Sequence, residues 1–289
     1  MPPRVVVWYR QRAWNRLQIS GQAGRSGVSA STIAHEARYN IRTWRPCGRR
    51  RKVVHVRRYT DYCPIGTGIE VLGDRWTPLV IREMSVGSTG FNEIHRGIPR
   101  ISRTLLSQRL RAMERRGLLR RQVDANGRSV RYTLTDAGEA LVPIIWSIGS
   151  WAAQWLYTDP TETDCDGVSL LWRMHQRADV SKLPEAHTVV QVILTGDGGA
   201  EGWLDIDRDG MTVCKEDQGK DDDLVVEADT GHLYKWLAGI VGFRELVTSG
   251  HARLIGPSRL ARAFPNWFTP SPFGAQLRES ARRLPARPA

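Results

Sequence analysis

The sequence lacks the patterns that mark membrane-spanning, secreted and thiolate-bound metal proteins. Its four cysteines form no C-x-x-C pair, which argues against a zinc site of that kind and against a disulfide framework. The longest apolar-leaning stretch, residues 143–157, is interrupted by polar residues and is too short to span a membrane. Only Val5–Val7 follow the first arginine as an apolar run, so we expect no secretory leader. These absences predict a cytoplasmic protein without membrane association.

Catalytic motifs are also missing. The seven histidines never reach H-E-x-x-H spacing, no G-x-S-x-G elbow occurs, and the dinucleotide-like Gly66-Thr67-Gly68 has Val71 in place of the third glycine. One metal motif is complete, because residues 205–216 match the calcium-loop pattern D-x-D-x-D-G-x5-E. An EF-hand needs flanking helices, which the glycine-rich neighbours do not favour, so we predict an exposed turn between strands. We therefore expect no enzyme, no metal and no cofactor.

The charge is unevenly distributed along the chain. The net charge is +12, and its excess lies in the first sixty residues. Residues 1–58 lack sustained periodicity and end in the basic run 49–52. Like-charge blocks repel and rarely fold alone. We predict a basic disordered arm or a start-site extension, with an RNA-binding arm and an organelle transit peptide as the alternatives.

Residues 59–157 open with a series of helices. Asp74 is placed to cap a helix that carries Trp76, Val80 and Met84 at helical spacing. A break at residues 87–90 precedes a short helix over 92–97, and a turn leads to a longer helix that starts at Ser102 and ends near Gly117. The pattern predicts a helix-turn-helix.

The longer helix separates into two faces at 100° per residue. Leu106, Leu110 and Met113 form an apolar stripe that would pack on the preceding helix. The opposite face is polar and cationic, and Glu114 is expected off it; its members are Arg103, Thr104, Ser107, Gln108, Arg111 and Arg115. Arginine pairs with phosphates, and Gln, Ser and Thr reach base edges in a major groove. We interpret this face as a DNA-reading surface, with a solvated face as the alternative.

Two short strands follow around the turn Ala125-Asn126-Gly127, which is a strong hairpin signal. The strands, over 118–124 and 128–134, carry four arginines: Arg120, Arg121, Arg128 and Arg131. A helix-turn-helix followed by a basic hairpin is a winged helix, in which the wing contacts the neighbouring backbone or minor groove.

The next helix begins near Asp136, with Glu139 placed as in a capping box. Its apolar residues recur at spacings of three and four: Leu141, Ile144, Ile148, Trp151 and Trp155. Packing on its own domain would explain this stripe. We favour a homodimer interface, because a winged helix that reads a two-fold operator must be paired.

An ordered series of motifs now carries a family resemblance. The motifs are Cys63-Pro64-Ile65, Leu72-Gly73-Asp74-Arg75-Trp76-Thr77, Phe91-Asn92-Glu93-Ile94, Ile101 to Leu110, Gly117-Leu118-Leu119 and Tyr132 to Gly138. Residues 59–157 resemble the HxlR-type winged-helix transcriptional regulators of bacteria. The resemblance implies a homodimer on double-stranded DNA, with these residues toward the DNA: Ser102, Arg103, Thr104, Ser107, Gln108, Arg111, Arg128 and Arg131. It also matches Cys63 to a cysteine that is a redox sensor in some members, whereas an inert thiol beside a helix start is the alternative.

The rest of the chain changes pattern. Residues 158–186 read as an acidic linker and a helix, and residues 187–268 alternate strands with helices, which favours an α+β sandwich. The segments 224–229, 250–257 and 263–268 resemble those of sterol-carrier-protein-like domains. The resemblance implies an apolar tunnel for a small apolar ligand, with Trp203, Trp236 and Phe243 as candidate pocket residues. We predict a disordered tail over 269–289.

The sequence therefore favours a regulator that binds pseudo-palindromic DNA and responds to an apolar ligand. A lipid or sterol carrier that uses its winged helix as an interaction module is the alternative. The two differ in whether Arg103→Ala and Arg111→Ala lose affinity for DNA.

Overall fold

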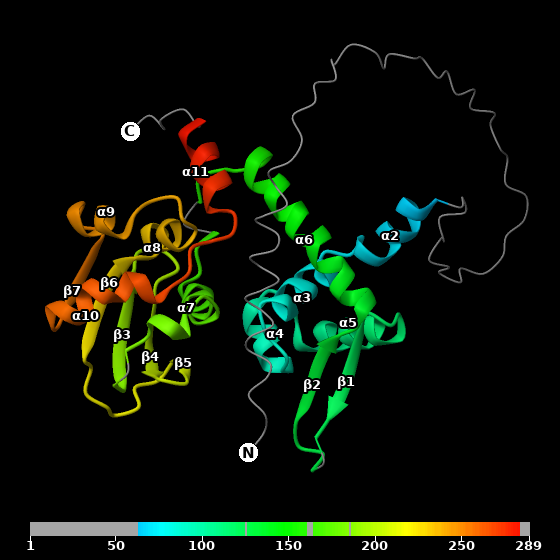
Figure 1. Ribbon diagram of the computed structural model, residues 1–289, viewed down its shortest axis with the longest axis horizontal. Coiled ribbons are helices and arrows are strands. Elements are labelled where there is room, and N and C mark those ends of the chain that lie inside the picture. The colour runs from blue at the N-terminus through cyan, green and yellow to red at the C-terminus, as the bar shows by residue number, and fades with distance from the viewer. Residues whose placement is uncertain (1–62, 125, 161–163, 185, 284–289) are drawn as a thin grey trace, which may run out of the picture. The chain divides into compact units, whose positions relative to one another are not determined.

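A computed structural model describes residues 63–124, 126–160, 164–184 and 186–283 (Figure 1). The basic arm expected over residues 1–58 lies outside the described residues. The described residues from Gly68 onward belong to one compact unit of the chain. Residues 68–156, which contain the helix expected to read DNA, are called the reader below. Residues 164–268 are called the C-terminal lobe.

Four helices open the described chain: α2 (Pro64–Leu72), α3 (Trp76–Ser85), α4 (Phe91–Gly97) and α5 (Arg103–Arg115). As expected, Asp74 caps α3, because its Oδ1 accepts the backbone N–H groups of Trp76 and Thr77 at 3.0 and 3.1 Å. Val80, Ile81, Ile94, Leu106 and Leu110 are almost completely buried in one core. This shared core sets the angle at which α5 leaves the turn.

The wing forms where the turn signal predicted it. Strands β1 (Leu119–Val123) and β2 (Val130–Leu134) pair antiparallel, with Leu119 opposite Leu134. The backbone N–H of Tyr132 donates to the Thr89 carbonyl at 2.8 Å, and an isolated bridge joins Gly90 to Arg131. The hairpin is therefore fastened to the segment between α3 and α4.

Helix α6 (Asp136–Trp155) follows the wing. Its cap is Thr135, whose Oγ1 accepts the Gly138 N–H at 3.2 Å, and not Asp136 as the sequence suggested. The Thr135 hydroxyl can accept this N–H because Thr135 lies just before the helix and has the extended backbone that a cap requires. Leu141, Val142 and Ile145 pack on the reader's core, so part of the apolar surface of α6 is used within its own chain.

The C-terminal lobe contains a five-stranded sheet in the order β5-β4-β3-β6-β7. Its strands are β3 (Thr188–Thr195), β4 (Ala200–Asp207), β5 (Gly210–Cys214), β6 (Leu224–Asp229) and β7 (Ala252–Ile255). Only β3 and β6 pair parallel, while the other neighbours pair antiparallel. The expected α+β arrangement is present, and Figure 1 shows the strands side by side.

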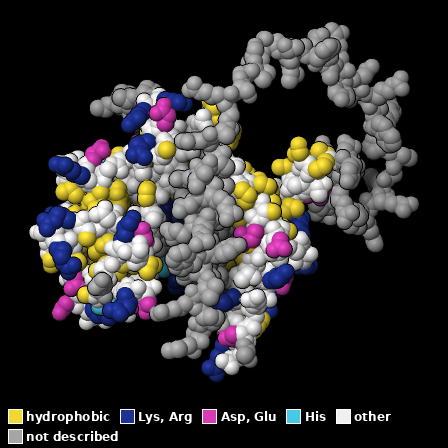
Figure 2. Space-filling model, in the orientation of Figure 1, with side chains coloured by type: hydrophobic (Ala, Val, Ile, Leu, Met, Phe, Trp, Pro, Cys, Tyr) yellow, Lys and Arg dark blue, Asp and Glu magenta, His cyan; other side chains and the backbone are white. Residues whose placement is uncertain are grey.

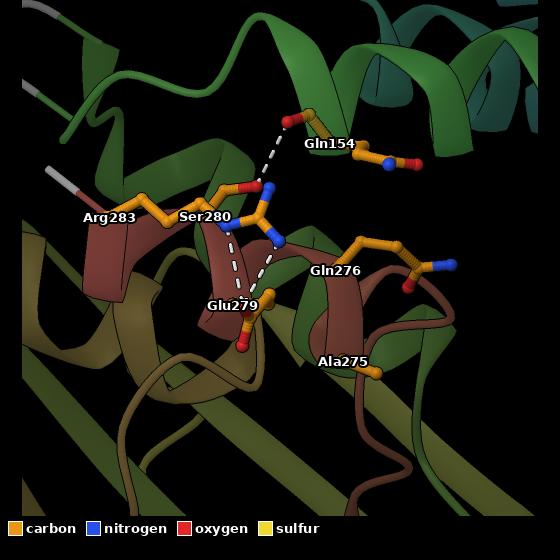
Figure 3. Close-up of a pocket in the computed structure, with 6 residues that line it drawn as sticks. All are labelled: Gln154, Ala275, Gln276, Glu279, Ser280 and Arg283. Carbon is orange, nitrogen blue, oxygen red and sulfur yellow. Dashed lines mark hydrogen bonds and ion pairs between the residues drawn. The ribbon is translucent and has the colours of Figure 1, made fainter.

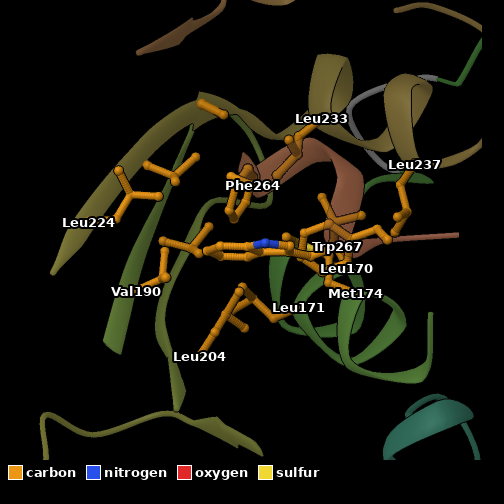
Figure 4. Packing of buried hydrophobic residues seen from close by; sticks show 14 of the residues in the cluster. Leu170, Leu171, Met174, Val190, Leu204, Leu224, Leu233, Leu237, Phe264 and Trp267 are labelled. Carbon is orange, nitrogen blue, oxygen red and sulfur yellow. The ribbon is translucent and has the colours of Figure 1, made fainter. Parts of the chain in front are cut away.

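One face of this sheet carries the helices of the lobe: α7 (Gly167–Gln176), α8 (Thr230–Leu237), α9 (Phe243–Thr248), α10 (Ser258–Ala263) and the 3₁₀ turn η3 (Phe264–Trp267). Trp267 and Phe264 are buried at the centre, between Val190, Leu204 and the leucines of α7 and α8 (Figure 4). Each fully buried side chain of this size contributes about 1.5–3 kcal/mol. Aromatic rings thus fill the region where the sterol-carrier resemblance implied a tunnel.

Helix α10 gives way to the 3₁₀ turn η3 at Phe264, because the proline at 265 removes a backbone donor. Two segments differ from the sequence expectations. Helix α2 was not predicted, since Gly66, Thr67 and Gly68 have low helix propensity. The tail was expected to be disordered, whereas Gly274–Arg283 form helix α11. Helix α11 is held by tertiary contacts that propensity does not record.

Phe273 supplies one of those contacts. Its ring lies 5.3 Å from the Trp146 ring, and a Cβ added at Gly149 of α6 would come within 2.4 Å of it. The segment that leads into α11 therefore packs closely against α6 because residue 149 has no side chain.

Candidate nucleic-acid interface

Helix α5 is fixed in rotation by its buried side. Leu106, Leu110 and Met113 are buried as the helical wheel predicted, and the Ser102 Oγ caps the helix by accepting the Leu105 N–H at 3.2 Å. Gly117 ends the segment with φ of +71°, a left-handed conformation that favours glycine. The remaining side of α5 consequently faces away from the reader's core.

That outward side is polar and accessible. Arg103, Thr104, Gln108 and Arg111 are exposed, and Ser107 is half-buried. Glu114 is exposed as well, and at 100° per residue it projects between Arg103 and Ser107. The expectation that this acid lies off the face is therefore wrong. The acid-free part is the N-terminal three turns, which are the part of a recognition helix that contacts bases.

Arg103 has two partners inside the reader. One of its Nη atoms donates to Asn92 Oδ1 at 2.7 Å, and its guanidinium lies 5.3 Å from the centre of the Phe91 ring. A guanidinium has five donors, so most remain for another ligand. Arg103 therefore ties the start of α5 to α4, a role that sequence reasoning missed because Asn92 lies eleven residues earlier.

Arg109 and Asp74 form a second tie. Their closest atoms are 3.3 Å apart. Burial acts to raise the pKa of Asp74, but the hydrogen bonds from Thr77 and Trp76, together with Arg109, hold that pKa below its ordinary value of 3.8. The Asp74 carboxylate thus caps α3 and also pairs with Arg109 of α5. Arg109 is used for this contact within the reader and is not part of the outward face.

The wing carries its arginines outward. Arg120, Arg121, Arg128 and Arg131 are all exposed. At the turn, the Asp124 carboxylate accepts the Arg128 backbone N–H at 2.8 Å. The turn is therefore closed by the backbone of Arg128 and not by its side chain. The exposed cations therefore extend from α5 onto the wing, as a surface for a polyanion would require.

Helix α6 leaves a large apolar stripe uncovered. Ile144, Ile148, Trp151 and Trp155 are 47–64% exposed, and hydrophobic side chains gather over α6 in Figure 2. Monomeric proteins rarely expose contiguous apolar patches of this kind without a use for them.

A hollow with a volume of about 300 Å³ lies elsewhere, between α6 and α11. Figure 3 shows its polar lining, in which Arg283 pairs with Glu279 at 3.1 Å and the Ser280 hydroxyl donates to the Gln154 carbonyl. It contains none of the expected pocket residues.

Those pocket residues are divided between the two faces of the sheet. Trp236 and Phe243 meet with ring centres 4.9 Å apart and pack on the helix-covered core. Trp203 lies opposite Gln191 in the sheet, one residue from the core-facing Leu204. Because side chains alternate along a strand, Trp203 occupies the other face and does not join them.

The calcium-like sequence forms the β4–β5 hairpin. Asp207 accepts the backbone N–H groups of Asp209 and Gly210 at 2.8 and 3.0 Å, while Asp205 contacts His187 and Lys220. The expected turn between strands is confirmed. No group of three or more potential metal-binding side chains occurs among the residues described.

Cys63 lies immediately before α2 and is half-buried, with its thiol unbridged. Burial raises the pKa of the Cys165 thiol, and Asp164 adds to the rise.

Among the described helices, none is long and apolar enough to cross a membrane.

These elements define a winged-helix protein with an exposed basic helix and wing. The HxlR-like helix-turn-helix family model matches residues 71–160. The HTH-type transcriptional regulator YvaP of Bacillus subtilis is 35% identical over 107 residues, which are 36% of this chain and 97% of YvaP. YodB of Bacillus subtilis, also an HTH-type transcriptional regulator, is 35% identical over 106 residues, 36% of this chain and 93% of YodB. The chain belongs to the HxlR-like helix-turn-helix family of transcriptional regulators.

Among solved structures, the reduced form of YodB shares 36% identity and covers 32% of this chain and 93% of that one, with a TM-score of 0.30. The family match confirms the HxlR resemblance drawn from the sequence. It ends at residue 160, so the whole C-terminal lobe lies beyond it.

Proposed function

We propose that the protein is a cytoplasmic transcriptional regulator that binds pseudo-palindromic double-stranded DNA as a homodimer. In this proposal α5 enters the major groove, where Thr104, Ser107 and Gln108 read base edges. Arg111 and the wing residues Arg128 and Arg131 hold phosphates, and Ser102 and Arg103 position the start of the helix at the backbone. The observation that carries the proposal is the exposed acid-free face over the first three turns of α5.

The DNA-binding test uses a duplex that the wild-type protein selects from a randomised pool. We expect Arg111→Ala to weaken binding and to reduce the slope of log affinity against log salt concentration by about one, as loss of one phosphate contact should. Gln108→Ala should relax base preference at one position, at a cost of about 1–3 kcal/mol. Arg253→Ala is the matched control, because Arg253 is an exposed arginine on β7 that pairs with Glu227. If Arg111→Ala and the control bind equally well, the proposal is wrong, and the carrier alternative gains support.

The homodimer part rests on the uncovered stripe of α6. Two recognition helices would then lie about one DNA turn apart, roughly 34 Å. Ile148→Asp places a charge in the middle of the stripe, and we expect sedimentation to show monomers that bind DNA weakly. Val247→Asp on α9 is the control, since Val247 is a similarly exposed aliphatic residue outside α6. Equal masses for both variants and the wild type would contradict this interface.

We further propose that the C-terminal lobe is a sterol-carrier-like module in which an apolar effector displaces aromatic side chains that fill the core between the sheet and its helices. The support is its helix-covered sheet and the aromatic group around Trp236. Titration with the fluorescent probe anilinonaphthalenesulfonate tests this: we expect saturable binding that Trp236→Ala reduces and Trp203→Ala does not. A response to Trp203→Ala alone would contradict it. A redox-sensing role for Cys63 stays a prediction, with an inert thiol as the alternative. It is tested by comparing the DNA binding of the wild type and of Cys63→Ser after diamide treatment.

A further inference from the structure

Helix α3 of the reader carries a carboxylate that is completely buried. The side chain of Glu83 has no exposed surface. It accepts hydrogen bonds from Arg173 Nη1 and from Gln176 Nε2, each at 2.7 Å, and Arg82 donates to it from the neighbouring position. Arg173 and Gln176 both belong to α7 of the C-terminal lobe. A buried charge demands partners of this quality, and two of the three come from the other lobe.

Helix α7 has a different surface on each side. Leu170, Leu171 and Met174 are buried in the core of the sheet. The residues that contact the reader are Arg173 and Gln176, joined by Trp172, whose ring lies 5.5 Å from the Arg96 guanidinium of α4. The helix is therefore packed on the sheet and hydrogen-bonded to the reader at the same time.

The contact reaches the turn that leads into α5. Arg173 Nη2 donates to the Gly97 carbonyl at 2.7 Å, and Arg82 donates to the same oxygen at 3.1 Å. Gly97 is the last residue of α4, five residues before the cap of α5. A Cβ at this position would lie 1.8 Å from a Glu83 oxygen, so α4 and the buried carboxylate are in direct contact.

We propose that Arg173 is a positioning residue for DNA recognition. By holding Glu83 and the Gly97 carbonyl together, it sets the place of α4 and hence the start of α5, and so the C-terminal lobe controls the affinity of the reader. The Arg173 side chain is a quarter exposed, and its hydrogen-bond partners are Glu83, Gln176 and the Gly97 carbonyl, none of which belongs to α5. This inference rests on the proposed function, because it concerns how the same DNA-binding face is held.

The test measures affinity and salt dependence for the full chain on the selected duplex. Arg173→Ala should weaken binding by about ten-fold, within the range of ordinary coupling between sites. Its salt slope should equal that of the wild type, because no phosphate contact is lost. Arg173→Lys should recover only part of the affinity, since one ammonium does not reproduce the two-directional donors of a guanidinium.

Gln176→Leu provides a second variant that keeps side-chain volume and removes one donor to Glu83. We expect a smaller loss of affinity with the same salt slope. Thermal unfolding identifies any variant that is unfolded at the assay temperature. If Arg173→Ala is unfolded, the affinity of Gln176→Leu decides whether the positioning role is correct. Arg253→Ala again serves as the surface control.

Each outcome has a distinct meaning. If Arg111→Ala leaves binding unchanged, the proposed function is wrong. If Arg111→Ala weakens binding while folded Arg173→Ala and Gln176→Leu bind like the wild type, the positioning role is wrong. A reduced salt slope for Arg173→Ala would show direct phosphate contact and would also overturn the inference.

Discussion

Replacing Gly97 by alanine introduces one methyl group at a crowded point between α3 and α4. The added Cβ would lie 1.8 Å from Glu83 Oε2 and 2.1 Å from its Cδ. A flexible, solvated glutamate would swing aside. Glu83 has no such freedom, because it is completely buried and three side chains donate to it. Either α4 moves away from α3 or the carboxylate leaves its partners.

Both responses distort the buried ion pair. Breaking such a pair destabilises the folded protein by about 3–5 kcal/mol. We therefore expect Gly97→Ala to lower the free energy of unfolding by about 3 kcal/mol or more. With a urea m-value of about 1–3 kcal/mol/M, this corresponds to a midpoint lower by at least about 1 M. Urea titration followed by tryptophan fluorescence measures it directly.

Gly68→Ala is the matched control. Gly68 lies within α2, and nothing is found within 4 Å of an added Cβ there. Alanine is the better helix former by about 1 kcal/mol, so this variant should be as stable as the wild type or more so. A loss below about 1 kcal/mol for Gly97→Ala would refute the claim that Glu83 is locked in place, since a cost that small fits ordinary repacking.

Two further predictions concern other contacts of the reader. Asp74→Ala removes the cap of α3 and should cost about 1 kcal/mol at neutral pH. The pKa of Asp74 is depressed below 3.8, so its contribution is present above that value and is lost as the pH falls through the depressed pKa; the difference in melting temperature between variant and wild type should shrink in acid. Gly149→Ala places a Cβ 2.4 Å from the Phe273 ring. We expect it to loosen α11, seen as faster amide exchange there than in the wild type and in the Gly68→Ala variant, whose added Cβ meets nothing within 4 Å; exchange equal to that of the wild type would contradict this packing.

Local patterns were enough to predict helices α3 to α6 and the wing of the reader. Leu106, Leu110 and Met113 share one side of an ideal helix, and burying them leaves a single choice for the outward face. The turn at residues 125–127 and the cap at Asp74 likewise act over a few residues. Each of these signals is complete within one short segment, which is why a single sequence contains it.

The contacts made across long separations were not predicted. In the pattern of α3, Glu83 stands next to Met84 and three residues after Val80, on the apolar side of the helix. An acid at such a position indicates a buried charge that needs a cation. Nothing local identifies that cation as Arg173, ninety residues away. Helix α11 was missed for the same reason, because its packing partner is α6.

The two-sided burial of α7 has a thermodynamic consequence. A movement of α7 that repacks Leu170 and Leu171 against the sheet also moves the donors that hold Glu83. An effector that binds the C-terminal lobe more tightly in one arrangement of α7 would therefore change the affinity of the reader for DNA. Linkage requires the reverse as well: DNA must change the affinity for the effector by the same factor. Arg173→Ala should reduce both effects together, because the side chain that joins the two equilibria is then absent.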